Sequence, residues 1–253
     1  AHSNNEGGKA RMLAYRLTHQ LSEITTNVSQ SASLSFEQLG AVPKNGITTV
    51  YNGINLDTFN YDASAREALI QELNLDAKSI ILLAVGRFHT AKDYPNLLQA
   101  FAQIMQNNAL KAVLLIAGDG DERGNIEHLI TTLALQGNVH LLGRRDDIPK
   151  LMSAADIFVL SSAFEGFGLV VAEAMACNTF VVATDCGGVK EVMGQTGMCC
   201  PSQNSEELAL ALTQAIEMPR KTMQENNLRA LKRVQGHFDL NLIEKKWLTL
   251  YET

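Results

Sequence analysis

The stretch Asp156–Ala176, DIFVLSSAFEGFGLVVAEAMA, is the clearest indication of the architecture of this chain. It begins with a run of aliphatic, β-branched and aromatic residues that predicts a buried strand at 156–160. A turn rich in Ser and Gly follows, and an apolar helical stretch is predicted at 168–177. Parallel strands need a crossover helix of this kind, so the stretch predicts one unit of a parallel sheet.

The same unit repeats from Ser79 onward. Short runs rich in Val, Ile and Leu predict further strands at 80–85, 112–117, 138–142, 179–183 and 197–199. Amphipathic patterns predict helices between them at 95–107, 122–135, 147–154, 188–193 and 204–217. Because the strands are continuously apolar, both sheet faces must be covered. The sequence therefore predicts an α/β fold, a Rossmann-like parallel sheet with helices on both faces.

The residues before this sheet follow a different pattern. Their predicted elements are, in order, a helix at about 6–21, a strand at 24–27 and a helix near 30–39. The cluster Pro43-Lys44-Asn45-Gly46 is typical of a turn, because Pro fixes φ and Asn-Gly tolerates the left-handed region. We expect residues 1–42 to be a separate piece, and a linker at 43–57.

The C-terminal part is expected to be helical. A main domain is predicted at 58–235, and the tail is expected to form two helices that separate at Gly236. Asp239 is a suitable N-cap for the last helix, at 236–253.

Composition narrows the class of protein. The formal net charge of −6 argues against a nucleic-acid partner, because phosphate affinity comes mainly from clustered Lys and Arg. A basic stretch near the C-terminus is compatible with peripheral contact with anionic lipid, but a solvated helix face is the preferred interpretation. It consists of Arg220, Lys221, Arg229, Lys232 and Arg233.

The cysteines and apolar runs favour a reduced, cytoplasmic protein. Cys177, Cys186, Cys199 and Cys200 have neither C-x-x-C spacing nor the density of a secreted disulfide scaffold. No apolar run approaches the roughly 20 residues of a membrane-spanning helix. The chain begins with Ala1 rather than Met, and we expect it to be a fragment of a longer protein.

The turn after the first sheet strand carries two cations. Gly86 and Arg87 leave the strand, and Lys92 precedes a helix that Pro95 is suited to start. An Arg fork, a Lys point charge and the free N–H groups of a helix start together suit a diphosphate. An ordinary pair of surface cations is an equally good interpretation of this turn alone.

The next two turns are less specific. Gly118, Gly120 and Gly124 are spaced one residue too widely for a dinucleotide fingerprint, which counts against a nicotinamide-dependent oxidoreductase. After Gly143, the backbone of Arg144 and Arg145 is placed to line a pocket for a flat base. For Asp146 and Asp147, capping of the next helix is the preferred role.

The turn after the strand at 156–160 carries two carboxylates. Glu165 lies at the strand end, and Glu173 lies about one turn into the following helix. A Glu in an otherwise apolar helix is costly to bury without a partner, and a carboxylate suits the vicinal hydroxyls of a sugar or ribose. A surface cap for Glu165 and an ion-paired acid for Glu173 are the alternative interpretations.

Taken together, these motifs resemble a known family. VGRFHTAKDYPNLLQAF, IAGDGDE, LLGRRDDIPKLMSAADIFVLSSAFEGFGLVVAEAMA and VVATDCGGVKEV occur in the order seen in the retaining glycosyltransferases of family 4, which have the GT-B fold. Glu165 and Glu173 match the E-x7-E pattern of that group. The resemblance runs from about residue 47 to 251, and residues 1–42 resemble the last portion of the N-terminal Rossmann-like domain.

The resemblance implies a donor site for a nucleotide-diphospho-sugar. Arg87 and Lys92 would bind the diphosphate, Glu173 the ribose and Glu165 the transferred sugar. The backbone of Phe167, Gly168 and Leu169 would contact phosphate or sugar oxygens, and Gly86 and Arg144 would complete the nucleotide site. AHSNN resembles the segment that holds an active-site His in the family, here His2.

The same resemblance implies a reaction without cofactor or metal. The donor's sugar would pass with retention of configuration to a saccharide, lipid-linked or small-molecule acceptor, in the cytoplasm or at the inner face of the membrane. A sugar-nucleotide epimerase of GT-B fold and a non-catalytic nucleotide-binding module remain alternatives.

Overall fold

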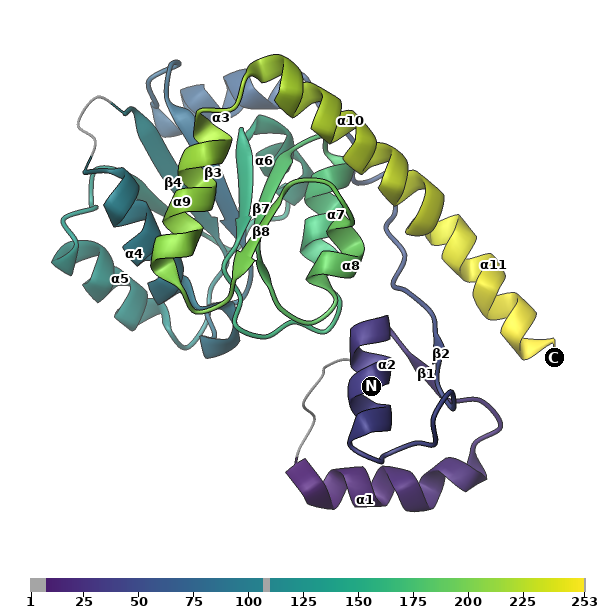
Figure 1. Ribbon diagram of the computed structural model, residues 1–253. Coiled ribbons are helices and arrows are strands. Elements are labelled where there is room, and N and C mark those ends of the chain that lie inside the picture. The colour runs from purple at the N-terminus through teal and green to yellow at the C-terminus, as the bar shows by residue number, and fades with distance from the viewer. Residues whose placement is uncertain (1–7, 107–109, 253) are drawn as a thin grey trace.

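The computed structural model describes residues 8–106 and 110–252. Most of them form one α/β unit around a six-stranded parallel sheet in the order β5-β4-β3-β6-β7-β8 (Figure 1). The strands are β3 (Ile80–Val85), β4 (Ala112–Ala117), β5 (Val139–Gly143), β6 (Ile157–Leu160), β7 (Phe180–Asp185) and β8 (Met198–Pro201). The predicted fold class is confirmed, and all six strands lie close to their expected positions.

Helices cover both faces of this sheet, as the apolar strands predicted. One face packs against α4 (Tyr94–Ile104), α5 (Arg123–Thr132) and α9 (Ser205–Ile216). The other packs against α3 (Ala65–Leu73), α6 (Ile148–Ala154), α7 (Leu169–Ala176), α8 (Val189–Met193) and α10 (Arg220–His237). Alternate strand residues serve the two cores: Leu83 faces one and Leu82 the other, because successive side chains point to opposite sides.

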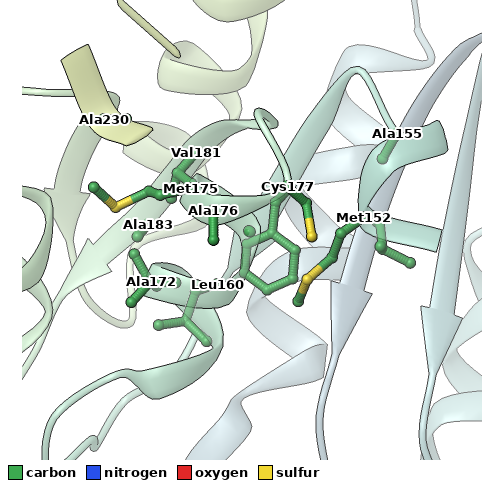
Figure 2. Packing of buried hydrophobic residues seen from close by; sticks show 14 of the residues in the cluster. Met152, Ala155, Leu160, Ala172, Met175, Ala176, Cys177, Val181, Ala183 and Ala230 are labelled. Atoms are coloured by element: carbon green, nitrogen blue, oxygen red, sulfur yellow. The ribbon is translucent and has the colours of Figure 1, made fainter. Parts of the chain in front are cut away.

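α7 is buried because almost all of its side chains are apolar. Ala172 and Met175 lie near Leu160, at the end of β6, and Val181, near the start of β7 (Figure 2). All four side chains are 3% exposed or less, so this part of the core is closed to solvent. The packing fixes the helix start, and with it the loop that precedes α7.

Two local predictions need correction. Gly236 does not break a helix; it lies inside α10, and the chain turns at the buried Phe238 before α11 (Leu240–Tyr251). The expected Asp239 cap of α11 is confirmed by a 2.9 Å hydrogen bond that its side chain accepts from Asn241 N–H. α3 was missed altogether, because only Ala65 and Leu69 of this helix are buried and its apolar pattern is weak.

The N-terminal residues form a small separate layer. Its elements are α1 (Gly8–Thr18), the 3-10 turn η1 (His19–Leu21), β1 (Thr26–Asn27), α2 (Gln30–Gln38) and β2 (Thr48–Thr49). β1 and β2 pair in parallel, and Met12, Phe36, Ala41 and Val42 form its core. The sequence did not predict β2, which consists of two threonines. In Figure 1 this layer lies beside the edge of the main unit nearest to α7 and α8.

The described helices include none that is both long and apolar enough to cross a membrane. All four cysteines are free thiols.

Candidate functional site

The sheet order brings two distant loops together. β3 and β6 are neighbours at the centre of the sheet, β4 and β5 extend from β3, and β7 and β8 extend from β6. The chain therefore reverses its winding direction between β3 and β6. In open α/β sheets ligands bind at the carboxyl ends of the strands at this switch point. The loop that carries Arg87 and Lys92 leaves β3 there, and the loop that carries Glu165 leaves β6.

Lys92 and Glu165 meet at this point. Lys92 ends the 3-10 turn η2 (Thr90–Lys92), and its Nζ lies 2.6 Å from Glu165 Oε1, with the two side chains only 24% and 14% exposed. Ser162 donates a 2.8 Å hydrogen bond to the same carboxylate oxygen, and Ser161 donates one of 2.8 Å to the Lys92 carbonyl. The two loops are thus bound to each other through both side chains and backbone.

Gly86 leaves room for the Lys92 side chain. A Cβ at Gly86 would lie 3.2 Å from Lys92 Cε, which is closer than most such contacts. The Gly86 carbonyl accepts a 2.9 Å hydrogen bond from the buried Tyr94 hydroxyl, which fixes the strand end. Lys92 therefore passes over Gly86 on its way to Glu165.

Glu173 is a partly buried acid. Within residues 8–106 and 110–252 its carboxylate makes no hydrogen bond or ion pair, so the ion-paired interpretation does not hold there. Burial alone raises the pKa of this carboxyl to about 7, because desolvation disfavours the charged form. A raised carboxyl pKa near an open loop is a common feature of ligand sites.

The start of α7 has the geometry expected of a phosphate-binding turn. Gly168 is the N-cap with φ +87°, a left-handed conformation that favours glycine, and a Cβ there would lie 2.9 Å from Val189 Cγ2. Val171 N–H donates a 2.9 Å hydrogen bond to the Gly168 carbonyl, and the helix geometry leaves the N–H groups of Leu169 and Val170 without an intrahelical partner. Leu169 is 37% exposed at this end, whereas Phe167 is buried with its ring stacked on Tyr51.

Arg87 points into a separate depression, which we call the Arg87 hollow. It measures about 610 Å³ and is lined by Val85, Gly86, Arg87, Ala117, Gly118, Asp119, Gly120, Arg144, Arg145, Asp146 and Ile148. Arg87 pairs with Asp121 at 3.1 Å, but both side chains are largely exposed, so the pair is weak. Arg144, another lining residue, is exposed.

A second depression, the Glu165 hollow, has both Lys92 and Glu165 in its lining. It measures about 510 Å³ and is lined by Ala91, Lys92, Ala163, Phe164, Glu165, Gly166, Asp185, Cys186, Gly187 and Ser202. Gly86, which Lys92 passes over, lines the Arg87 hollow, so the two hollows belong to neighbouring parts of the same strand ends.

Arg145 is fixed by two carboxylates that sequence reasoning did not connect to it. Its guanidinium donates to both oxygens of Asp147 at 2.8 Å and to both oxygens of Glu72 at 2.5 and 3.1 Å. These bonds raise the pKa of Arg145. Asp147 occupies the N-cap position of α6, but its side chain caps nothing, so the expected capping role is wrong. Glu72 comes from α3, the helix that was not predicted.

Other sequence-based candidates stand as follows. His2 lies outside the described residues. In the described part of the chain no three His, Cys, Asp or Glu side chains gather where they could hold a metal ion. Ser162 was overlooked because a serine in a turn carries no distinctive signal, although its position three residues before Glu165 suits a local hydrogen bond.

Sequence comparison shows the family to which the chain belongs. Residues 65–230, which hold every strand of the large sheet and all the described candidate residues, match the model of glycosyl transferases group 1. The chain belongs to this family. Its fold matches about half to two thirds of the length of solved GT-B glycosyltransferases.

In two comparisons the chain matches part of a longer protein. It is 32% identical over 234 residues to N-acetyl-alpha-D-glucosaminyl L-malate synthase of Bacillus anthracis, covering 91% of this chain and 59% of that protein. The chain thus spans somewhat more than half the length of this relative. The crystal structure of Anabaena HepE in complex with UDP and glucose matches with a TM-score of 0.87 and 26% identity, over 98% of this chain and 68% of that one.

Proposed function

We propose that the protein transfers a sugar from a nucleotide-diphospho-sugar to an acceptor with retention of anomeric configuration, and that this chain carries the donor site. The observation on which this depends is the contact of Lys92 with Glu165 at the switch point, beside the free N–H groups of α7. Family membership and the UDP and glucose bound to HepE support it.

Each residue then has a role. Lys92, Arg87 and the start of α7 would bind the diphosphate and stabilise the charge that develops on it as the leaving group. Glu165 would accept hydrogen bonds from the transferred sugar in the Glu165 hollow. Glu173 would accept hydrogen bonds from the ribose.

The two walls of the Arg87 hollow complete the nucleotide site in this proposal. Gly86 and Arg144 would contact the nucleoside, and the backbone of Phe167, Gly168 and Leu169 would contact phosphate or sugar oxygens. We propose that these cations and N–H groups replace a metal ion. If so, treatment with EDTA leaves nucleotide affinity unchanged.

The test is calorimetric titration of the chain with UDP, ADP and GDP. We expect at least one to bind, and Lys92→Met to weaken that binding about tenfold or more, because a charge-assisted hydrogen bond contributes about 1.5–3 kcal/mol. Lys111→Met is the matched control, since Lys111 pairs with Asp76 at the start of β4, the opposite end of the sheet. No binding of any of the three by the unaltered chain would refute the proposal.

Transfer itself is proposed to require more than this chain. Relatives extend well beyond the matched part, and we propose that residues 1–42 are the end of their second Rossmann-like domain, which would supply acceptor contacts. A relative from Campylobacter jejuni, 28% identical, is named as an N-acetylgalactosaminyltransferase acting on a diphospho-undecaprenol. Lipid-linked acceptors are therefore worth including with saccharides and small molecules when a radiolabelled donor is assayed. Label on an acceptor would indicate transfer, and a new sugar epimer would indicate isomerisation.

A further inference from the structure

The segment between β7 and α8 carries a Gly-Gly pair in backbone contact with the loop Glu165–Gly168, which we call the donor loop. Gly187 has φ +54°, and a Cβ there would overlap the Glu165 carbonyl. The Gly188 N–H donates a 3.2 Å hydrogen bond to the Gly166 carbonyl, and a Cβ on Gly188 would lie 3.0 Å from that oxygen. Only glycines allow this approach, so the pair supports the loop that presents Glu165.

Glu191, on α8, binds the start of α2. Its Oε2 accepts a 2.8 Å hydrogen bond from Gln30 N–H, and its Oε1 accepts one of 2.6 Å from Ser31 N–H. These N–H groups open α2 and have no intrahelical acceptor. A carboxylate is also favoured at this end by the helix dipole. The residues are about 160 positions apart in sequence, so this contact links two distant parts of the chain.

Both contacts converge on one carbonyl of the donor loop. Ser29, the N-cap of α2, accepts a 3.1 Å hydrogen bond from Ala32 N–H and donates one of 3.1 Å to the Gly166 carbonyl. That oxygen therefore receives bonds from both Ser29 and Gly188. Next to it, the buried Phe167 ring stacks on Tyr51, whose hydroxyl lies 3.4 Å from Glu191 Oε2.

We propose that Glu191 is a positioning residue that ties α2 to the loop Glu165–Gly168. By holding the start of α2, Glu191 keeps Ser29 against the Gly166 carbonyl, and this contact fixes the backbone that carries Glu165 and leads into α7. The inference rests on the proposed function only in naming this loop as the donor site. The position of α2 and the conformation of the donor loop are then coupled. A nucleotide that binds at the loop therefore also stabilises the start of α2.

Amide hydrogen exchange of the chain without nucleotide tests the tie. Glu191→Ala is expected to speed exchange at Gln30 and Ser31 by about tenfold or more, in line with the loss of hydrogen bonds to a charged group, and also to speed exchange of the loop 165–168. Glu191→Gln keeps one acceptor oxygen and should give an intermediate effect. Glu206→Gln, an exposed acid in the first turn of α9, is the control and should change neither.

Thermal unfolding of each variant shows whether the fold is retained. Faster exchange at the start of α2, with unchanged exchange in the loop 165–168, would overturn the inference. Glu191 would then only cap a helix. If Glu191→Ala does not fold, the exchange rates of α2 and of the loop 165–168 are compared in Glu191→Gln instead, with the same criterion.

UDP gives a second readout. In the unaltered chain UDP should slow exchange at the loop and at the start of α2, whereas in Glu191→Ala it should slow exchange at the loop alone. Equal slowing at α2 in both proteins would refute the tie. If UDP slows nothing even in the unaltered chain, the proposed function is contradicted, and the exchange data without nucleotide still decide the tie.

Discussion

Glu173 combines a cost in stability with a proposed role in binding the ribose. Its folded pKa of about 7 lies above the ordinary value of 4.5, so the folded chain binds a proton more tightly than the unfolded chain does. The free energy of unfolding should therefore fall as pH rises from about 4.5 to 7 and stay low above that range. The shift corresponds to an upper limit of about 3 kcal/mol.

We predict that Glu173→Gln raises the free energy of unfolding at pH 8 by about 1–3 kcal/mol and leaves it nearly unchanged at pH 4. Urea denaturation at both pH values measures this. The same variant should bind UDP more weakly, because an amide has one acceptor oxygen instead of two. Glu225→Gln, an exposed acid on α10, is the control; a Glu173→Gln variant less stable at pH 8 would contradict the raised pKa.

At the scale of elements, α3 contacts the Arg87 hollow, the proposed nucleotide side of the site, through Glu72 and Arg145. The Glu72–Arg145–Asp147 cluster fixes the turn after β5, which forms one wall of the Arg87 hollow. We predict that Glu72→Gln weakens UDP binding about three- to tenfold but leaves pyrophosphate binding unchanged, since only the wall near the base loosens. Titration calorimetry with both ligands tests this, and Glu67→Gln, an exposed acid on the same helix, is the control.

A second prediction at this scale concerns two glycines in contrasting surroundings. Gly236 lies within α10 with nothing near the position of a Cβ, so Gly236→Ala should stabilise the chain by about 0.5–1 kcal/mol. Gly118 has φ +149°, and its Cβ would overlap the Gly86 carbonyl, so Gly118→Ala should destabilise by about 2 kcal/mol or more. Denaturant midpoints compare the two variants, and destabilisation by Gly236→Ala would mean that α10 ends before this residue.

For the whole molecule, α11 contributes little to the stability of the main unit. Ile243 is its one buried side chain in the described structure, and the helix joins the rest through a bridge between Ile54 and Asp239. Removing residues 240–253 should lower the free energy of unfolding by only about 2 kcal/mol, comparable with the burial of one aliphatic side chain. Ile243→Ala should account for most of that loss in urea denaturation. Complete unfolding on truncation would refute this estimate.

Much of the molecule could be predicted from sequence because its main signals are local. Each strand of the large sheet is a mainly apolar run, and Glu165 and Glu173 lie in the turn and the helix of a recognisable strand–turn–helix segment. Contacts between distant residues carried no such signal. Glu72, which binds Arg145, and Glu191, which binds the start of α2, both make such contacts. The residues beside them in the sequence do not indicate these partners.

The central position of β3 and β6 has a consequence during synthesis. Ile81 N–H donates to the Asp156 carboxylate 75 positions later, so the middle of the sheet closes only after most of the apolar strands have been made. Until then β3 presents an unpaired edge that is apolar on both faces, which favours aggregation. The high sequence separation of this pairing should make folding slow. The free edge of β3 stays exposed until residues 157–160 have emerged from the ribosome and can pair with it.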